Sequence, residues 1–169
     1  PLDLRTVCIA LATEMVHLSL GLDTEEAERA VLEAITSGSA KAKLKEWIAA
    51  QGGDESYVDN PELFPVSNFT HEVKAPRGGY ITSMNAEEIG IASVVLGAGR
   101  MTKDDAIDHS AGIVLNKKSG DYVNEGEVIA LLYTNKEDKI ADAERTILAS
   151  VQIGDTSPTI LPLIYKIVK

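Results

Sequence analysis

The sequence has few of the residues that most often build metal centres, disulfides or nucleophilic sites. One cysteine, Cys8, and three histidines occur in 169 residues. A single cysteine excludes an intrachain disulfide and fits a reducing compartment, so we expect the cytoplasm. The histidines, His17, His71 and His109, show no His-x-His or His-x-x-x-His spacing, whereas zinc sites need three or four ligands at recognisable spacing. We therefore assign no metal ligand in this chain.

Long apolar runs and excess positive charge are also lacking. The longest apolar stretches, such as Val128 to Tyr133, fall far short of the roughly 20 residues that span a bilayer. The 26 acidic residues outnumber the 16 basic ones and give a net charge of -10. This charge repels a phosphate backbone or an anionic membrane, so we expect neither nucleic acid nor a membrane as a partner.

The first third of the chain has the apolar periodicity of amphipathic helices. The apolar stripe of the first helix includes Cys8, which we expect to be buried. Asp23 with Glu26 three positions later has the form of a capping box for the second helix. Trp47 lies at helical spacing in the third and is expected to pack in the core. The three predicted helices run from Asp3 to Leu20, from Asp23 to Ile35 and from Ser39 to Gln51.

After Pro65 the period changes and short strands alternate with two helices. The turn "APRGG" and the glycines near Gly120 and Gly126 separate these strands. The sequence therefore predicts an α+β fold with two domains, a helical segment at residues 1–66 and an α+β domain at residues 67–169. The predicted strands are Phe69 to Lys74, Tyr80 to Asn85, Ala111 to Leu115 and Val128 to Tyr133, and the predicted helices are Ala86 to Leu96 and Lys136 to Ser150.

The stretch "KKSGDYVNEGEVIALLYTN" from Lys117 to Asn135, followed by Lys136, resembles half of a biotinyl or lipoyl carrier domain. In those domains the modified lysine sits at an exposed hairpin tip, and an Ala-Pro-x-x-Gly half follows directly. Here "APRGGYITSM" comes some forty residues earlier, and a helix is predicted to begin at Lys136. A solvated surface lysine beside acidic residues is the simpler interpretation, although a carrier domain stays an alternative.

Four motifs, in this order and spacing, carry a resemblance that covers the whole chain. They are "AQGGD" at 50–54, "VKAPRGGYI" at 73–81, "LGAGR" at 96–100 and "GDYVNEGE" at 120–127. The chain resembles the C-terminal part of the pyrimidine-nucleoside phosphorylases, the family that includes thymidine phosphorylase. The resemblance implies the back of an α/β catalytic domain followed by a hammerhead domain with a barrel-like sandwich. The start at Pro1 rather than Met fits a segment of a longer protein.

The resemblance implies reversible phosphorolysis of a pyrimidine nucleoside to the base and a (deoxy)ribose 1-phosphate by a homodimeric parent enzyme. This chemistry needs cations and backbone N–H groups around phosphate, and donors on the base carbonyls. The family places these groups, and a monovalent cation site, in segments before Pro1. We therefore carry over no catalytic, substrate-binding, cofactor or metal residue, and we expect the isolated chain to be inactive.

One loop is a candidate for supporting domain closure in the parent enzyme. Gly97 and Gly99 permit unusual backbone angles, and Arg100 beside them can make bidentate contacts. We expect the loop from Gly97 to His109 to pack near the closing cleft. The alternative is an ordinary surface loop in which Arg100 pairs with Asp104 or Asp105. A non-enzymatic interaction domain is the remaining alternative for the chain as a whole.

Overall fold

The computed structural model describes residues 1–168, which form two compact units. One comprises residues 1–63 with the tail from Leu161, and the other comprises residues 64–160. The two sequence domains, residues 1–66 and 67–169, stay a prediction about domain organisation. In the structure, the tail from Leu161 packs with the helical unit, and its side chains line a pocket with Val7 and Leu11.

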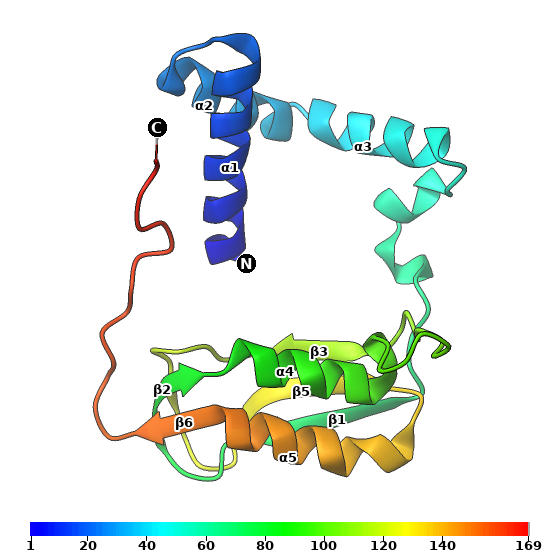
Figure 1. The fold of residues 1–169 in the computed structure, drawn as a ribbon, viewed down its shortest axis with the longest axis vertical. Coiled ribbons are helices and arrows are strands. Elements are labelled where there is room, and N and C mark those ends of the chain that lie inside the picture. The colour runs from blue at the N-terminus through cyan, green and yellow to red at the C-terminus, as the bar shows by residue number, and fades with distance from the viewer. Residues whose placement is uncertain (169) are drawn as a thin grey trace. The chain divides into compact units, whose positions relative to one another are not determined.

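The first unit is helical, as the apolar periodicity predicts. Gly21, with φ 67, ends the first helix in the left-handed conformation that glycine adopts readily. The Asp23 carboxylate accepts a hydrogen bond from the Glu26 N–H and Glu26 reaches back to the Asp23 N–H, which confirms the capping box. The elements are α1 (Leu2–Leu20), α2 (Thr24–Thr36), α3 (Ser39–Ala50) and the 3-10 turns η1 (Glu55–Val58) and η2 (Pro61–Leu63) (Figure 1).

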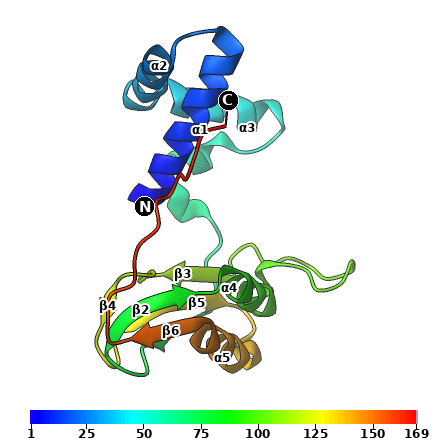
Figure 2. The ribbon, with the colours of Figure 1, turned by 60° about the vertical axis from the view of Figure 1, so that its left-hand side comes forward.

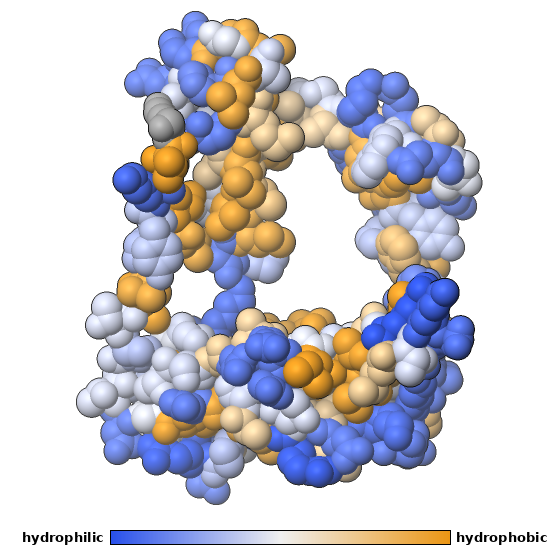
Figure 3. Space-filling model, in the orientation of Figure 1, coloured by the Kyte–Doolittle hydropathy of each residue, from blue (hydrophilic) through white to orange (hydrophobic). Residues whose placement is uncertain are grey.

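The helical unit buries few side chains. Packing of α1 on α2 buries Thr13, Ala27 and Val31. The predictions for Cys8 and Trp47 are wrong, since Cys8 is exposed and Trp47 is 60% exposed. Their spacing places them on apolar faces, but the neighbouring elements leave both side chains exposed. Figure 3 shows hydrophobic surface along α1. Four apolar side chains of this helix are exposed: Leu4, Leu11, Met15 and Leu18.

The second unit is α+β. It contains two three-stranded antiparallel sheets, one in the order β1-β5-β3 and the other in the order β4-β2-β6. The helix α5 leads directly into β6. The elements are β1 (Phe69–Lys74), β2 (Gly79–Met84), α4 (Ala86–Ser93), the π-helical turn η3 (Val94–Ala98), β3 (Gly112–Leu115), β4 (Tyr122–Val123), β5 (Val128–Thr134), the 3-10 turn η4 (Glu137–Lys139), α5 (Ile140–Ser150) and β6 (Val151–Gly154).

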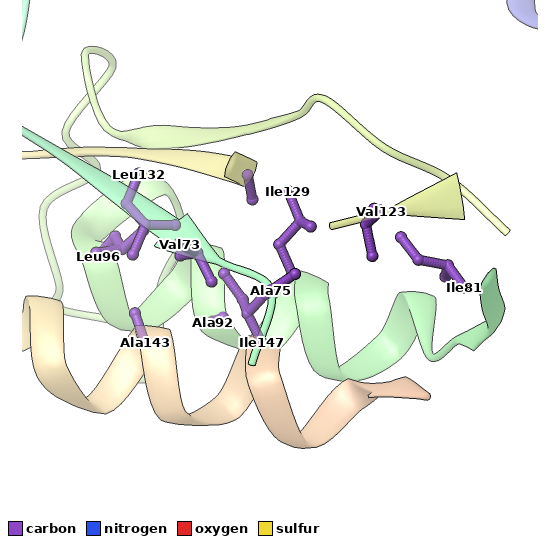
Figure 4. Packing of buried hydrophobic residues seen from close by; sticks show 11 residues of the cluster. Val73, Ala75, Ile81, Ala92, Leu96, Val123, Ile129, Leu132, Ala143 and Ile147 are labelled. Carbon is purple, nitrogen blue, oxygen red and sulfur yellow. The ribbon is translucent and has the colours of Figure 1, made fainter. Parts of the chain in front are cut away.

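The core of the second unit lies between the sheets and the helix pair α4 and α5. In Figure 4, Val73 of β1 and Leu132 of β5 lie near Leu96, while Ile147 of α5 lies near Ala92 of α4. All five side chains have no exposed surface. Ala130, Leu132 and Thr134 alternate along β5 and are all buried, so the pleat places the Thr134 hydroxyl in the core.

Within residues 1–168, no single helix is long and apolar enough to cross a bilayer. By length and composition alone, α1 and α2 qualify together, as a pair bent by 117°.

Candidate functional site

The loop predicted to support closure begins at a distorted end of α4. The helix widens into the π-helical turn η3, in which Gly97 has φ 112 and ψ -2. Only glycine adopts this conformation without strain. The carbonyl oxygen of Leu96 accepts a 2.7 Å hydrogen bond from the buried Thr134 hydroxyl. Figure 2 shows the segment that follows projecting from the body of the unit.

Asp108 closes the base of this loop. Its N–H donates to the carbonyl oxygen of Gly97 at 2.9 Å. Its carboxylate accepts hydrogen bonds from the N–H and the hydroxyl of Ser110 at 3.0 and 2.7 Å, and from the side-chain amide of Asn135 at 2.8 Å. These donors, with the Ser110 hydroxyl first, and the nearby Lys136 charge lower the pKa of the Asp108 carboxyl.

Asp105 organises the tip of the loop. Its carboxylate accepts hydrogen bonds from the N–H groups of Met101 and Thr102 at 2.9 and 2.8 Å, and from the Thr102 hydroxyl at 2.7 Å. The Thr102 side chain is the main cause of the lowered pKa of the Asp105 carboxyl. Arg100 is exposed and has no hydrogen bond or ion pair within residues 1–168. The loop tip is therefore held by Asp105 and not by an ion pair of Arg100 with Asp104 or Asp105, which was the alternative interpretation of this loop.

The three residues predicted for this loop have different environments. The constraint at Gly97 is its positive φ, because a Cβ there would meet the nearest atom of Asp108 at an ordinary 3.4 Å. Gly99 has an extended backbone, but a Cβ would lie 2.7 Å from a methyl group of Val94. Close packing therefore favours glycine at 99. Gly97 is buried, Gly99 is half-buried and Arg100 is exposed, so the three residues do not form one binding surface.

A pocket of about 320 Å³ lies where the loop meets the start of α5. Asp105 and Asp142 contribute negative charge to its lining, and Lys136 and Lys139 contribute positive charge. These formal charges balance. The lining is therefore not a concentrated anion-binding site of the kind expected for inorganic phosphate.

Lys136, the lysine of the carrier alternative, lies after β5 and is the N-cap residue of η4. It is not at the tip of a hairpin. Its Nζ would be 3.7 Å from a Cβ built on Gly97, and its charge contributes to lowering the pKa of Asp105 and Asp108. The side chain thus lies against the loop base instead of extending toward a second protein.

The histidines and acidic residues do not converge on a metal centre. Within residues 1–168, no group of three or more His, Cys, Asp or Glu side chains could hold a metal ion. The Nε2 atom of His71 lies 3.0 Å from a carboxylate oxygen of Glu144, and the Nδ1 atom of His17 lies 2.6 Å from the carbonyl oxygen of Leu22.

Comparison with known proteins gives this unit a family. The model of the pyrimidine nucleoside phosphorylase C-terminal domain matches residues 80–154. Proteins named pyrimidine-nucleoside phosphorylase from Staphylococcus aureus strains USA300 and NCTC 8325 are each 44% identical to this chain over 171 residues. Residues 80–154 thus match the C-terminal domain of pyrimidine nucleoside phosphorylases, and the chain as a whole is similar to the C-terminal part of these proteins.

The match covers nearly all of this chain but only part of each relative. A phosphorylase of the same name from the bovine strain RF122 / ET3-1 is also 44% identical, and in each alignment 99% of this chain matches 39% of the relative. The chain thus spans about two fifths of the length of these phosphorylases. The matched C-terminal domain, residues 80–154, includes the loop from Gly97, its base at Asp108 and the anchoring residues Thr134 and Asn135.

Sequence reasoning missed the residues that hold this loop. It singled out Gly97, Gly99 and Arg100 but not Asp108, Ser110, Thr134 or Asn135. One local signal was available, since Asp108 with Ser110 two positions later is the pattern of a side chain that bonds its own turn. The Thr134 and Asn135 partners lie far away in sequence, so no local pattern could have identified them.

Proposed function

We infer that this chain is the C-terminal part of an enzyme that reversibly cleaves pyrimidine (deoxy)nucleosides with inorganic phosphate. The products are the free base and (deoxy)ribose 1-phosphate. The observation that carries this proposal is 44% identity to pyrimidine-nucleoside phosphorylases along 99% of the chain. Because the chain spans only 39% of those relatives, the activity is proposed for the longer protein.

The chemistry of the reaction indicates which part of the enzyme binds phosphate and nucleoside. Cleavage of the glycosidic bond builds positive charge on the sugar and negative charge on the departing base, so cations and N–H donors must surround phosphate and base. The pocket beside Lys136 and Lys139 has balanced charges instead. We assign phosphate and nucleoside binding to the part of the enzyme beyond this chain, and we expect the isolated chain to be inactive.

The role of residues 64–160 is to support closure of the active-site cleft. Three observations favour the Gly97–His109 loop for this role. A π-helical turn, a type of distortion frequent at functional sites, starts the loop. Asp105 and Asp108 hold its tip and base in a defined conformation. Arg100 is exposed at the start of the loop and is free of partners within residues 1–168, so its guanidinium can make a bidentate contact on closure.

The helical unit contributes the back of the catalytic α/β domain. Its support is the apolar surface along α1 (Figure 3). Leu18 is 80% exposed, and Leu4, Leu11 and Met15 are exposed as well. Contiguous apolar patches on soluble proteins usually mark an interface. In the longer enzyme we expect the remainder of the catalytic domain to cover this face.

Three other features of the enzyme are proposed from the family resemblance. They are a homodimeric assembly, a monovalent cation site outside this chain, and hammerhead topology for the C-terminal α+β domain. Cytoplasmic location is proposed from the single cysteine, which fits a reducing compartment.

The proposed reaction is tested with the full-length product of the gene. Release of uracil from uridine and of thymine from thymidine is followed by ultraviolet absorbance, with and without inorganic phosphate. Release that depends on phosphate and yields a sugar 1-phosphate is expected. Equal release without phosphate would identify a hydrolase and contradict the proposal.

A further inference from the structure

Asn135 bridges two parts of the second unit that lie far apart in sequence. Its side-chain Nδ2 donates hydrogen bonds to the Asp108 carboxylate at 2.8 Å and to the Ser110 hydroxyl at 3.0 Å. Its Oδ1 accepts a hydrogen bond from the N–H of Asn68 at 2.8 Å. Both ends of one amide are therefore used, the donor end on the loop base and the acceptor end on the residue before β1.

Neighbouring bonds fix the position of this amide. The Thr134 hydroxyl donates to the Leu96 carbonyl oxygen and accepts from the Lys136 N–H at 2.9 Å. Thr134 has no exposed surface, so the backbone on both sides of Asn135 is tied to the core of the unit. Asn135 itself is exposed, and its contacts are not required to satisfy a buried group. A role in positioning its partners accounts for all three bonds better than a role in core stability.

The partners of Asn135 lie at the base of the loop and directly before β1. Asp108 closes the loop through its N–H bond to the Gly97 carbonyl oxygen. Asn68 directly precedes β1, at the end of residues 64–68, the linker that follows η2 and begins the second unit. A displacement of this segment is therefore transmitted to the loop base through the side-chain amide of Asn135.

We propose that Asn135 is a positioning residue, which holds the base of the Gly97–His109 loop in register with the linker that ends at Asn68. The proposal rests on the closure role assigned to this loop. When the linker moves during closure, Asn135 carries the loop base with it, so that the loop reaches its closed position. Loss of this bond leaves substrate binding to the open enzyme intact and impairs the step that follows.

The sharpest test exchanges the amide and the carboxylate. Asn135→Asp keeps the acceptor for the Asn68 N–H but places a carboxylate against Asp108, so the linker contact is kept and the loop contact is lost. Adding Asp108→Asn restores the hydrogen bond in the reverse direction, because the new amide at position 108 can donate to the new carboxylate at position 135. The amide oxygen at position 108 can still accept from Ser110. Asn116→Asp, at an exposed position of the same unit, is the control for the added charge.

Kinetics of the full-length enzyme give the first readout. Asn135→Asp is expected to lower kcat about tenfold with KM within about twofold of wild type, because closure after substrate binding is impaired and closure steps often limit turnover. The double variant is expected to recover most of the loss, and Asn116→Asp to match wild type. Unchanged kcat in Asn135→Asp, or no recovery in the double variant, would overturn the proposal.

Amide hydrogen exchange of the 169-residue chain gives a second readout that does not need activity. Asn135→Asp is expected to speed exchange at the Asp108 N–H about tenfold while the Asn68 N–H stays protected, and the double variant is expected to reverse this. Unchanged exchange at Asp108 would overturn the anchoring role. If the wild-type enzyme releases no base with phosphate while the exchange pattern is as expected, the proposed reaction fails and the anchor stands.

Discussion

The hydroxyl of Thr134, at the end of β5, donates a 2.7 Å hydrogen bond to the carbonyl oxygen of Leu96, 38 residues earlier in the chain. This bond joins the buried face of the β1-β5-β3 sheet to the π-helical turn from which the loop starts. Leu96 and Thr134 both have no exposed surface, so water cannot replace either partner. The position of the loop is therefore set from the core of the unit.

Thr134→Val tests this bond. Valine has nearly the same shape, but it leaves the Leu96 carbonyl oxygen and the Lys136 N–H without their partner. We expect the free energy of unfolding of the 169-residue chain to fall by about 2 kcal/mol, the cost of leaving buried polar groups unpaired. Urea unfolding measures it. Thr70→Val on the exposed side of β1 is the matched control, and an equal effect of the two changes would contradict the account.

Two glycines of the α4 segment are expected to respond in opposite directions to alanine. Gly97→Ala forces a φ of 112 on a residue with a Cβ and should lower the free energy of unfolding by about 1–2 kcal/mol. Gly90→Ala, inside α4 with open space at its Cβ position, should raise it by roughly 0.5–1 kcal/mol. Thermal unfolding of both variants gives the signs, and a stabilising Gly97→Ala would show that the turn is not as described.

The capping box at the start of α2 predicts a smaller effect. Asp23→Ala removes the acceptor for the Glu26 N–H and should cost about 1 kcal/mol of stability. Asp23→Asn keeps an acceptor at the same place and should stay close to wild type. Circular dichroism during urea unfolding compares the two. An alanine variant as stable as the asparagine variant would mean that the cap contributes nothing.

The carboxyl of Asp59 is expected to titrate well below an ordinary aspartate. Ion pairs with the Lys41 and Lys45 Nζ atoms, at 2.7 and 2.6 Å, lower its pKa from 3.8 to about 2. Because the folded pKa is the lower one, the stabilising contribution is complete above about pH 3.8 and is lost as the pH falls through about 2. Carboxyl carbon NMR gives the midpoint, and Lys45→Gln should move it upward. A wild-type midpoint near 3.8 would refute the pairing.

Much of the local structure could be predicted from the sequence because it depends on local signals. The three N-terminal helices, the Asp23 capping box and four of the strands follow from apolar periodicity and turn residues. The strands β4 and β6 were missed. One has two residues, and the other follows α5 without a turn that would mark the change. The helix expected from Lys136 begins as the 3-10 turn η4 and becomes α-helical at Ile140.

The rest depends on contacts between distant segments. The fit of Trp47 to an apolar face was visible, but whether anything covers that face was not, and Trp47 is exposed. Gly97 was predicted as a permissive position, and its φ of 112 agrees with that role. The groups that hold its loop, Thr134 and Asn135, act across 38 and 27 residues of sequence. Periodicity within a short window carries no information about such partners.

The most direct test of the account assays the 169-residue chain and the full-length gene product side by side for phosphate-dependent release of thymine and uracil. The account predicts that the full-length product is active and that this chain alone is inert. The relative rates on the two nucleosides then give the substrate preference. Activity of the isolated chain would show that catalytic groups lie within it, and absence of activity in both would contradict the proposed reaction.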